Sequence, residues 1–253
     1  MMLSLQRAGM WKRISAFLFD FILLGIVAVL FAFCLSAALD YDGYIDTLNA
    51  SYEKYGAEYG VDFQMTLSEY DNMTGEENDR LNQAYSALGA DDSAVYAYNM
   101  MIRLTILIIS LSILFACLIL EFVIPLFFGN GQTLGKKIFS LGLMRSDFVR
   151  VSRTGLFIRV FLGKYTIETM VPVLILLMLY FGSLGLEGTL VLLGLGVVQL
   201  VLLAATHAHT PIHDLLAGTV VVDFPSQMIF DSRETLIAYK EKRHAEKAAA
   251  QPY

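Results

Sequence analysis

The sequence has little of what stabilises small secreted proteins or carries out catalysis. It contains two cysteines, Cys34 and Cys117, and both lie inside apolar segments, so we expect neither a disulfide framework nor a cysteine-ligated metal site. No nucleophile–base pair or strong metal signature occurs, which predicts that the chain is not an enzyme and carries no cofactor. Charged residues make up only 17% of the chain, and the net charge of −6 gives no reason to expect a nucleic-acid partner.

Long apolar runs are present instead. The chain is 56% hydrophobic with a mean hydropathy of +0.58, which is too apolar for an ordinary soluble domain. About 20 apolar residues cross a bilayer as a helix. We therefore predict an all-α membrane protein with about four transmembrane helices, at residues 14–39, 100–128, 165–181 and 189–206.

Charges of opposite sign occupy different parts of the chain. Residues 40–99 contain thirteen Asp and Glu against two basic residues, whereas 15 of the 18 Lys and Arg fall before the first span, in residues 129–164 or in the tail. Basic loops stay in the cytoplasm. We expect a multi-pass protein of a bacterial plasma membrane, with both termini cytoplasmic and anionic lipid headgroups contacting the basic face.

These patterns divide the chain into seven segments. The acidic loop is expected outside the membrane as a helical insertion, because Thr74 and Glu77 fit a capping box that begins a helix at residues 76–88, with another at 46–59. The segments are an N-terminal lip and first span (1–39), the acidic loop (40–99), the second span (100–128), a basic loop with an amphipathic interfacial helix at 154–164 (129–164), a helical hairpin (165–206), a His/Asp motif (207–223) and a charged tail (224–253).

Two acids are expected at membrane depth. Asp20 follows Arg13 by seven residues, so both side chains lie on one helix face about 10 Å apart along the axis. Glu121 sits at a similar depth in the second span, and Arg13 and Asp214 both lie near the inner face, where an ion pair between them is available. An acid inside the bilayer is costly unless it faces protein, water or a partner. These four charges form either an ion pathway or a structural polar core.

Two polar motifs flank the spans. Residues 131–137 read Gly-Gln-Thr-Leu-Gly-Lys-Lys, one residue too short for a nucleotide-binding phosphate loop, so we interpret them as a turn whose lysines face lipid headgroups. His207, His209 and His213 have a spacing that zinc would accept, but no His-Glu-x-x-His pattern accompanies them. We predict no metal there and interpret the segment as a polar exit from the last span.

Three blocks taken together resemble the RDD family of bacterial membrane proteins. That family is named for one Arg and two Asp, and Arg13, Asp20 and Asp214 occupy the matching positions. The resemblance covers residues 7–39 and 100–222, and the acidic loop is longer than the connection typical of the family. The other motif residues that carry it are Gly131, Gln132, Thr133, Gly135, Lys136, His213, Gly218 and Thr219.

Two functions remain open from the sequence. The resemblance implies a transport role, with sodium/proton exchange suggested for family members, and carboxylates sharing a proton or cation inside the membrane suit such a carrier. A carrier of four spans would form a homo-oligomer or join another membrane protein. The alternative is a non-catalytic accessory protein that binds a partner through its outer loop or cytoplasmic tail.

Overall fold

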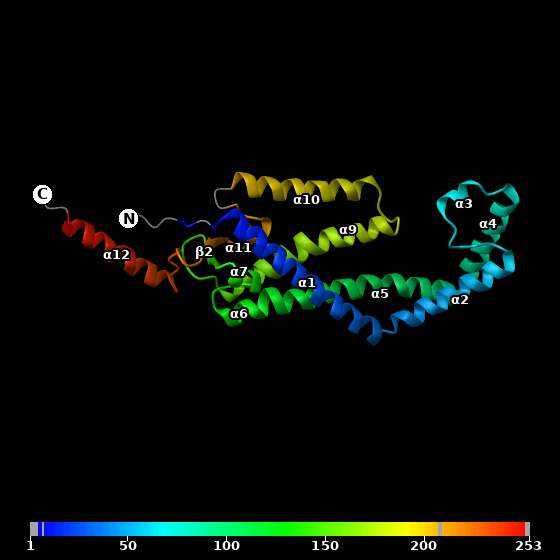
Figure 1. Ribbon diagram of the computed structural model, residues 1–253, viewed down its shortest axis with the longest axis horizontal. Coiled ribbons are helices and arrows are strands. Elements are labelled where there is room, and N and C mark those ends of the chain that lie inside the picture. The colour runs from blue at the N-terminus through cyan, green and yellow to red at the C-terminus, as the bar shows by residue number, and fades with distance from the viewer. Residues whose placement is uncertain (1–4, 7, 207–208, 251–253) are drawn as a thin grey trace. The chain divides into compact units, whose positions relative to one another are not determined.

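The computed structural model describes residues 5–6, 8–206 and 209–250. Within these residues, four helical runs are long and apolar enough to cross a membrane: Met10–Ala38, Asp92–Phe128, Arg153–Tyr180 and Leu186–Ala205. The prediction of an all-α membrane protein with about four spans is confirmed. Two short strands are the exception to the helical pattern. Figure 1 shows the order of the elements along the chain.

The chain divides into two compact units, one of residues 30–112 and one of residues 1–29 and 113–253. The smaller unit holds helices α2 (Tyr41–Tyr59), α3 (Leu67–Asp71) and α4 (Gly75–Ala90), with the adjoining ends of α1 (Met10–Ala38) and α5 (Asp92–Cys117). These helices include the two that the acidic segment predicts, and both are longer than expected.

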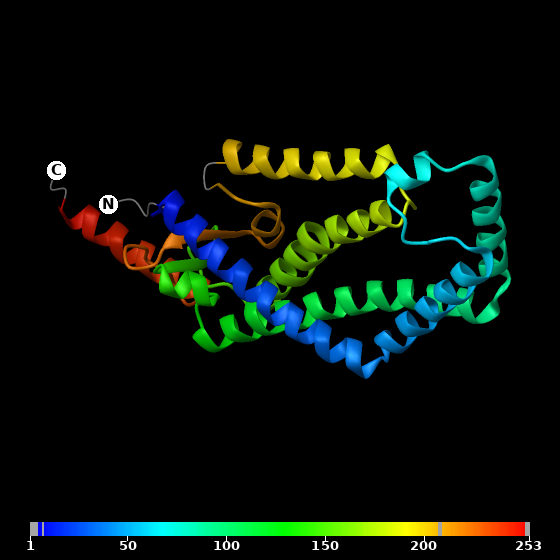
Figure 2. The ribbon, with the colours of Figure 1, turned by 45° about the vertical axis from the view of Figure 1, so that its right-hand side comes forward.

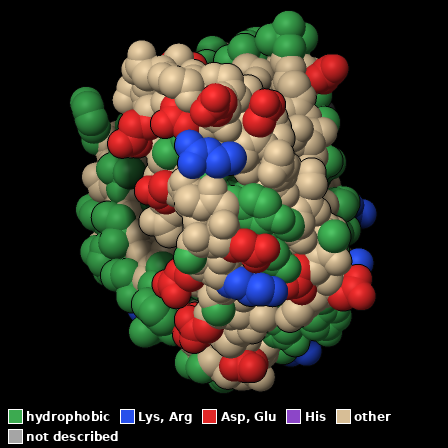
Figure 3. Space-filling model, turned by 90° about the vertical axis from the view of Figure 1, so that its right-hand side faces the viewer, with side chains coloured by type: hydrophobic (Ala, Val, Ile, Leu, Met, Phe, Trp, Pro, Cys, Tyr) green, Lys and Arg blue, Asp and Glu red, His purple; other side chains and the backbone are tan. Residues whose placement is uncertain are grey.

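Local interactions explain why this acidic unit folds. Thr74 and Glu77 form the expected capping box at the start of α4, which satisfies two backbone donors that the helix leaves unpaired. The ring of Phe63 lies 5.2 Å from that of Tyr52 and 5.1 Å from that of Tyr85, so aromatic contacts join α2 to α4 through the intervening loop. Acidic side chains gather on the surface of this end, where basic ones are few (Figure 3).

The larger unit is built on segments of irregular helix. In the second span, α5 passes into a π-helical turn, η1 (Leu118–Val123), and then α6 (Ile124–Phe128). The third span runs from α8 (Arg153–Phe157) through a long π-helical segment, η2 (Ile158–Met170), into α9 (Val171–Tyr180). The expected interfacial helix at 154–164 is therefore continuous with the third span. Its amphipathic pattern arises from charged residues that face the protein interior.

The last two spans form a hairpin. Helix α9 is followed by α10 (Leu186–Ala205) after a turn that includes Gly182, and the two helices diverge away from that turn (Figure 2). Many large apolar side chains along α10 are exposed, including Leu190, Leu193 and Val197. A bilayer is the environment that such a surface requires.

Two short helices and two strands form a small subdomain of the larger unit. Short helix α7 (Leu134–Ile138) leads into β1 (Leu141–Arg145), and α11 (Ile212–Ala217) leads into β2 (Thr219–Asp223). The strands pair antiparallel, with Leu143 opposite Val221, and their buried apolar side chains belong to two hydrophobic clusters of the core. The segment 207–223, expected as a polar exit, is thus a folded element where the structure describes it. Helix α12 (Arg233–Ala250) forms the tail.

Candidate functional site

Asp20, on α1, holds the loop that precedes α7. Its carboxylate accepts hydrogen bonds from the Thr133 hydroxyl at 2.5 Å and from the Gly135 backbone N–H at 2.7 Å. Gly135 has to lack a side chain, because a Cβ there would collide with the Ala16 carbonyl oxygen and the Asp20 carboxylate. In the sequence, Arg13 is the charged residue nearest to Asp20 on the first span, but the direct partners of Asp20 come from the motif after the second span.

The rest of this motif is buried beside Asp20. The Gln132 amide donates to the Leu141 carbonyl oxygen at 2.6 Å, and Gly131 has a positive φ. The ammonium of Lys136 donates to the Thr133 hydroxyl at 3.2 Å. Burial, together with the charge of Arg159, lowers the pKa of Lys136 to about 8. Both lysines were expected to face lipid headgroups, but Lys136 points into the protein and only Lys137 is exposed.

The partner of Asp214 is Arg159, on η2, rather than the Arg13 that the sequence suggested. The Arg159 Nε atom lies 2.7 Å from the Asp214 carboxylate, and each residue is 1% exposed. The hydroxyl of Thr219, which follows Gly218 at the end of α11, donates to the same carboxylate oxygen at 2.6 Å. Burial alone would raise the pKa of Asp214, but the neighbouring Arg159 and His213 and the hydrogen bonds from Arg159 and Thr219 together outweigh it and hold the pKa below its ordinary value.

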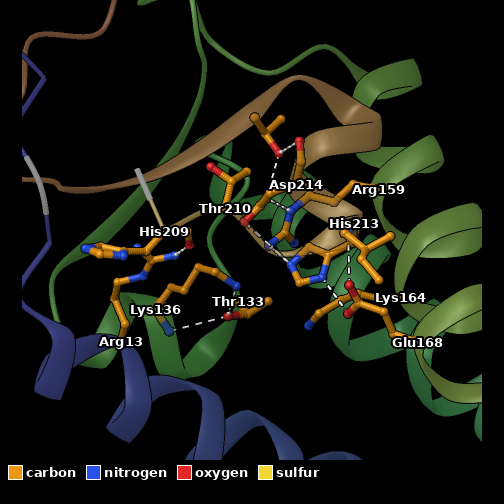
Figure 4. A network of polar contacts seen from close by, with 12 residues as sticks. Arg13, Thr133, Lys136, Arg159, Lys164, Glu168, His209, Thr210, His213 and Asp214 are labelled. Carbon is orange, nitrogen blue, oxygen red and sulfur yellow. Dashed lines mark hydrogen bonds and ion pairs between the residues drawn. The ribbon is translucent and has the colours of Figure 1, made fainter. Parts of the chain in front are cut away.

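His213 joins this pair to a second acid. Its Nε2 atom lies 3.0 Å from a terminal nitrogen of Arg159, which can only donate, and its Nδ1 atom lies 2.7 Å from the Glu168 carboxylate. The ring is therefore assigned as neutral, with its proton on Nδ1. Burial lowers the pKa of His213, which agrees with a neutral ring. Figure 4 shows His213 between Arg159 and Glu168.

Close packing makes this arrangement possible. Helix α11 lies against η2, and a Cβ added to Gly163 would lie 2.5 Å from the Cβ of His213 and 2.6 Å from its Cα. The backbone N–H of His213 donates to Glu168 at 2.9 Å, so that carboxylate holds both the ring and the main chain of α11.

Glu121, on η1, is paired with Lys164 of η2. The Lys164 ammonium lies 2.5 Å from the Oε1 atom of Glu121, which is 3% exposed. The Oε2 atom is buried and has no hydrogen-bond partner among the described residues. A buried carboxylate oxygen without a partner is costly, so it marks a position where a cation or proton would be stabilised.

Arg13 donates a hydrogen bond from its guanidinium to the His209 carbonyl oxygen at 2.7 Å. The His209 ring in turn lies 2.6 Å from the Leu203 carbonyl oxygen through Nδ1. Among the described residues, no group of three or more His, Cys, Asp and Glu side chains is placed to hold a metal ion. His207, the third candidate zinc ligand, lies outside the described residues.

Two adjoining cavities meet at this network. The first has a volume of about 430 Å³ and is lined by the acids Asp20, Glu121 and Glu168 together with Lys164. The second has about 500 Å³ and shares Asp20, Lys164 and Glu168 with the first. Its other charged lining residues are Arg13, Lys136, Arg159 and Asp214. Both volumes fall in the range of roughly 300–1,000 Å³ typical of small-ligand sites.

Three residues of this network carried no role in the sequence-based prediction: Arg159, Lys164 and Glu168. The available signal was the one that identified Asp20, a charge within an otherwise apolar segment. Arg159 and Lys164 were overlooked because residues 154–164 were interpreted as an interfacial helix, in which charges face water. Glu168 falls within the span predicted at 165–181 and was given no role there.

The comparison with known families agrees with this geometry. A model of the RDD family matches residues 7–218, which include all of the network described above except Thr219. No curated protein and no solved structure matched the chain. Arg13, Asp20 and Asp214, the three residues that carry the resemblance in the sequence, all line the second cavity. Because the family match covers most of the chain, the protein belongs to the RDD family.

Proposed function

We propose that the protein is a proton-coupled cation carrier, with sodium as the first cation to test. The observation that supports this proposal is the cavity of about 430 Å³, in which three carboxylates face a single lysine. Three acids at membrane depth exceed what the lysine can neutralise, and an excess of negative charge in a low dielectric favours binding of a cation or a proton.

The Glu121–Lys164 pair suggests how exchange would occur. The cation binds at the free Oε2 oxygen of Glu121 and competes with the Lys164 ammonium for that carboxylate. Repulsion between the cation and the ammonium then drives Lys164 to release its proton, so one cation enters for each proton that leaves. Because the described acids do not converge as a metal site, the bound cation keeps part of its water shell.

We also propose how the protein is oriented in the membrane. The acidic unit of residues 30–112 faces outward, and the basic loop and both ends of the chain lie in the cytoplasm, because Lys and Arg are concentrated there. The signature residues would then lie toward the cytoplasmic side of the membrane, in a bacterial plasma membrane.

Flux measurements on purified protein in liposomes test the proposal. We expect an imposed sodium gradient to drive proton movement in the opposite direction, reported by a pH-sensitive dye inside the vesicles. The double variant Glu121→Gln/Lys164→Gln removes both charges of the pair without leaving either unpaired, and we expect it to lose this exchange.

A matched pair on the surface provides the control. Lys12 and Asp223 lie 2.9 Å apart with half of the lysine side chain exposed, and Lys12→Gln/Asp223→Asn should keep the exchange. If the wild-type protein moves neither sodium nor protons, the carrier proposal fails and the accessory function, partner binding through the outer unit or the tail, becomes the better explanation.

A further inference from the structure

The second cavity has the opposite electrical character to the first. It is lined by four basic residues, Arg13, Lys136, Arg159 and Lys164, and by three acids, Asp20, Glu168 and Asp214. This surplus of positive charge plays no part in sodium binding at Glu121, and the hydrogen bonds of the three acids determine how much of it they neutralise.

Each acid of this cavity already accepts hydrogen bonds from the protein. Asp20 accepts from Thr133 and Gly135, Glu168 accepts from both the ring and the backbone of His213, and Asp214 binds Arg159 through Nε. Their lone pairs are thus largely used by the protein, so they leave some basic nitrogens of the cavity without a negative partner.

Two such nitrogens are identified. Arg159 is 1% exposed, and its Nη1 atom is buried without a hydrogen-bond partner among the described residues. The ammonium of Lys136 has the neutral hydroxyl of Thr133 as its hydrogen-bonding partner. A buried donor left unpaired costs roughly 1–3 kcal/mol, and more when it is charged, so both atoms favour a ligand that accepts hydrogen bonds and carries negative charge.

We propose that this cavity binds a phosphate-bearing anion between Lys136 and Arg159. A phosphate group offers several charged oxygens, which suit the planar guanidinium of Arg159 and the point charge of Lys136. The apolar part of the wall includes Ile14 of α1 and Leu203 of α10, two helices that face lipid. The phosphate can therefore come from a lipid headgroup or from a soluble ion.

Lys137 gives an unusually close control. It follows Lys136 directly, but it is exposed, and its ammonium lies 3.8 Å from the centre of the Phe128 ring. Lysines that bind anions only through general surface attraction would respond equally to replacement. A site built inside the cavity responds only to the replacement of Lys136.

The test uses the full-length purified protein and two probes. Inorganic phosphate is titrated at constant ionic strength, and separately the protein is placed in phosphatidylcholine vesicles with or without phosphatidylglycerol; thermal unfolding reports binding in both arms. We expect Lys136→Gln to weaken binding about tenfold, as the loss of one charge-assisted hydrogen bond predicts, and Lys137→Gln to leave it unchanged. Leu203→Trp, which fills the cavity without changing its charges, should also weaken binding, and it serves if Lys136→Gln does not fold.

Stabilisation by phosphate alone identifies a soluble source, and stabilisation by phosphatidylglycerol alone identifies a lipid headgroup; either result supports the site. The proposal is overturned if neither probe stabilises the wild-type protein. It is equally overturned if Lys136→Gln and Lys137→Gln lose the same amount of binding.

Discussion

The Lys164 ammonium lies 2.5 Å from the Glu121 carboxylate, and each residue sits on a π-helical segment of a different span. The backbone hydrogen bonds of a π-helical segment depart from the i→i−4 pattern of an α-helix, and such segments often occur at functional sites. Here they turn charged side chains of two spans toward one another, so that the pair joins the second and third spans inside the membrane.

This pair predicts that single neutralisations are worse than the double one. Glu121→Gln leaves the partly buried Lys164 without its acid, and Lys164→Gln leaves the buried Glu121 without its ammonium partner. Each variant should lower the free energy of unfolding, the second by about 3–5 kcal/mol. The double variant should recover most of that loss. Thermal unfolding in detergent measures it, and a double variant as unstable as the worse single variant would show that the pair does not act as a unit.

A second prediction concerns the contact between η2 and α11. Gly163→Ala places a methyl group 2.5 Å from the Cβ of His213 and should destabilise the protein by about 1–3 kcal/mol through overpacking. The control is Gly194→Ala on α10, where no atom lies within 4 Å of the added Cβ. Equal stability of the two variants would mean that α11 moves aside without cost.

The pH dependence of stability follows from Lys136. Its folded-state pKa, lowered to about 8 from 10.5 by burial, lies below the unfolded value, so between these values the unfolded state binds more protons and stability rises with pH. The charges that face it are Arg159, Glu121, Lys164 and Asp20. The unfolding temperature of wild type relative to Lys136→Gln should therefore increase from pH 8 toward 10, and Lys137→Gln should behave like the wild type. A flat difference would contradict the assignment.

The proposed orientation predicts which side chains a membrane-impermeant thiol reagent reaches. In a Cys34→Ser background, Ser68→Cys and Ser93→Cys are exposed on the acidic unit and should be labelled in intact cells. Ala245→Cys, exposed on α12, should be labelled only after lysis. The reverse pattern would invert the topology and place the signature residues at the outer side.

The spans and the acidic unit were predictable because they depend on composition. A run of apolar residues predicts a span wherever it packs, and the Thr74–Glu77 capping box is a local interaction within four residues. The pairing of Asp20 with Thr133 was not predictable, since those residues are 113 positions apart and nothing in either segment specifies the other. The same holds for the two strands, whose apolar residues resemble the edge of a span.

The partner of Asp214 was missed for a geometric reason. Lys164 follows Arg159 by five residues, which in an α-helix is about 500° and puts the two side chains on different faces. In a segment with i→i+5 hydrogen bonds the same spacing closes about one turn. The α-helical spacing used for the prediction therefore placed Arg159 and Lys164 on different faces, whereas the π-helical spacing brings them to one polar face of the third span.

That π-helical segment also makes the network sensitive to chain length. Deleting one residue between Arg159 and Lys164 would rotate every later side chain of the span about the helix axis, turning Lys164 and Glu168 away from Glu121 and His213. Many single substitutions of the lipid-facing residues in this stretch would leave those contacts intact. Insertions and deletions in η2 should thus be far less tolerated than exchanges of one apolar residue for another, and the number of residues becomes as much a part of the site as their identity.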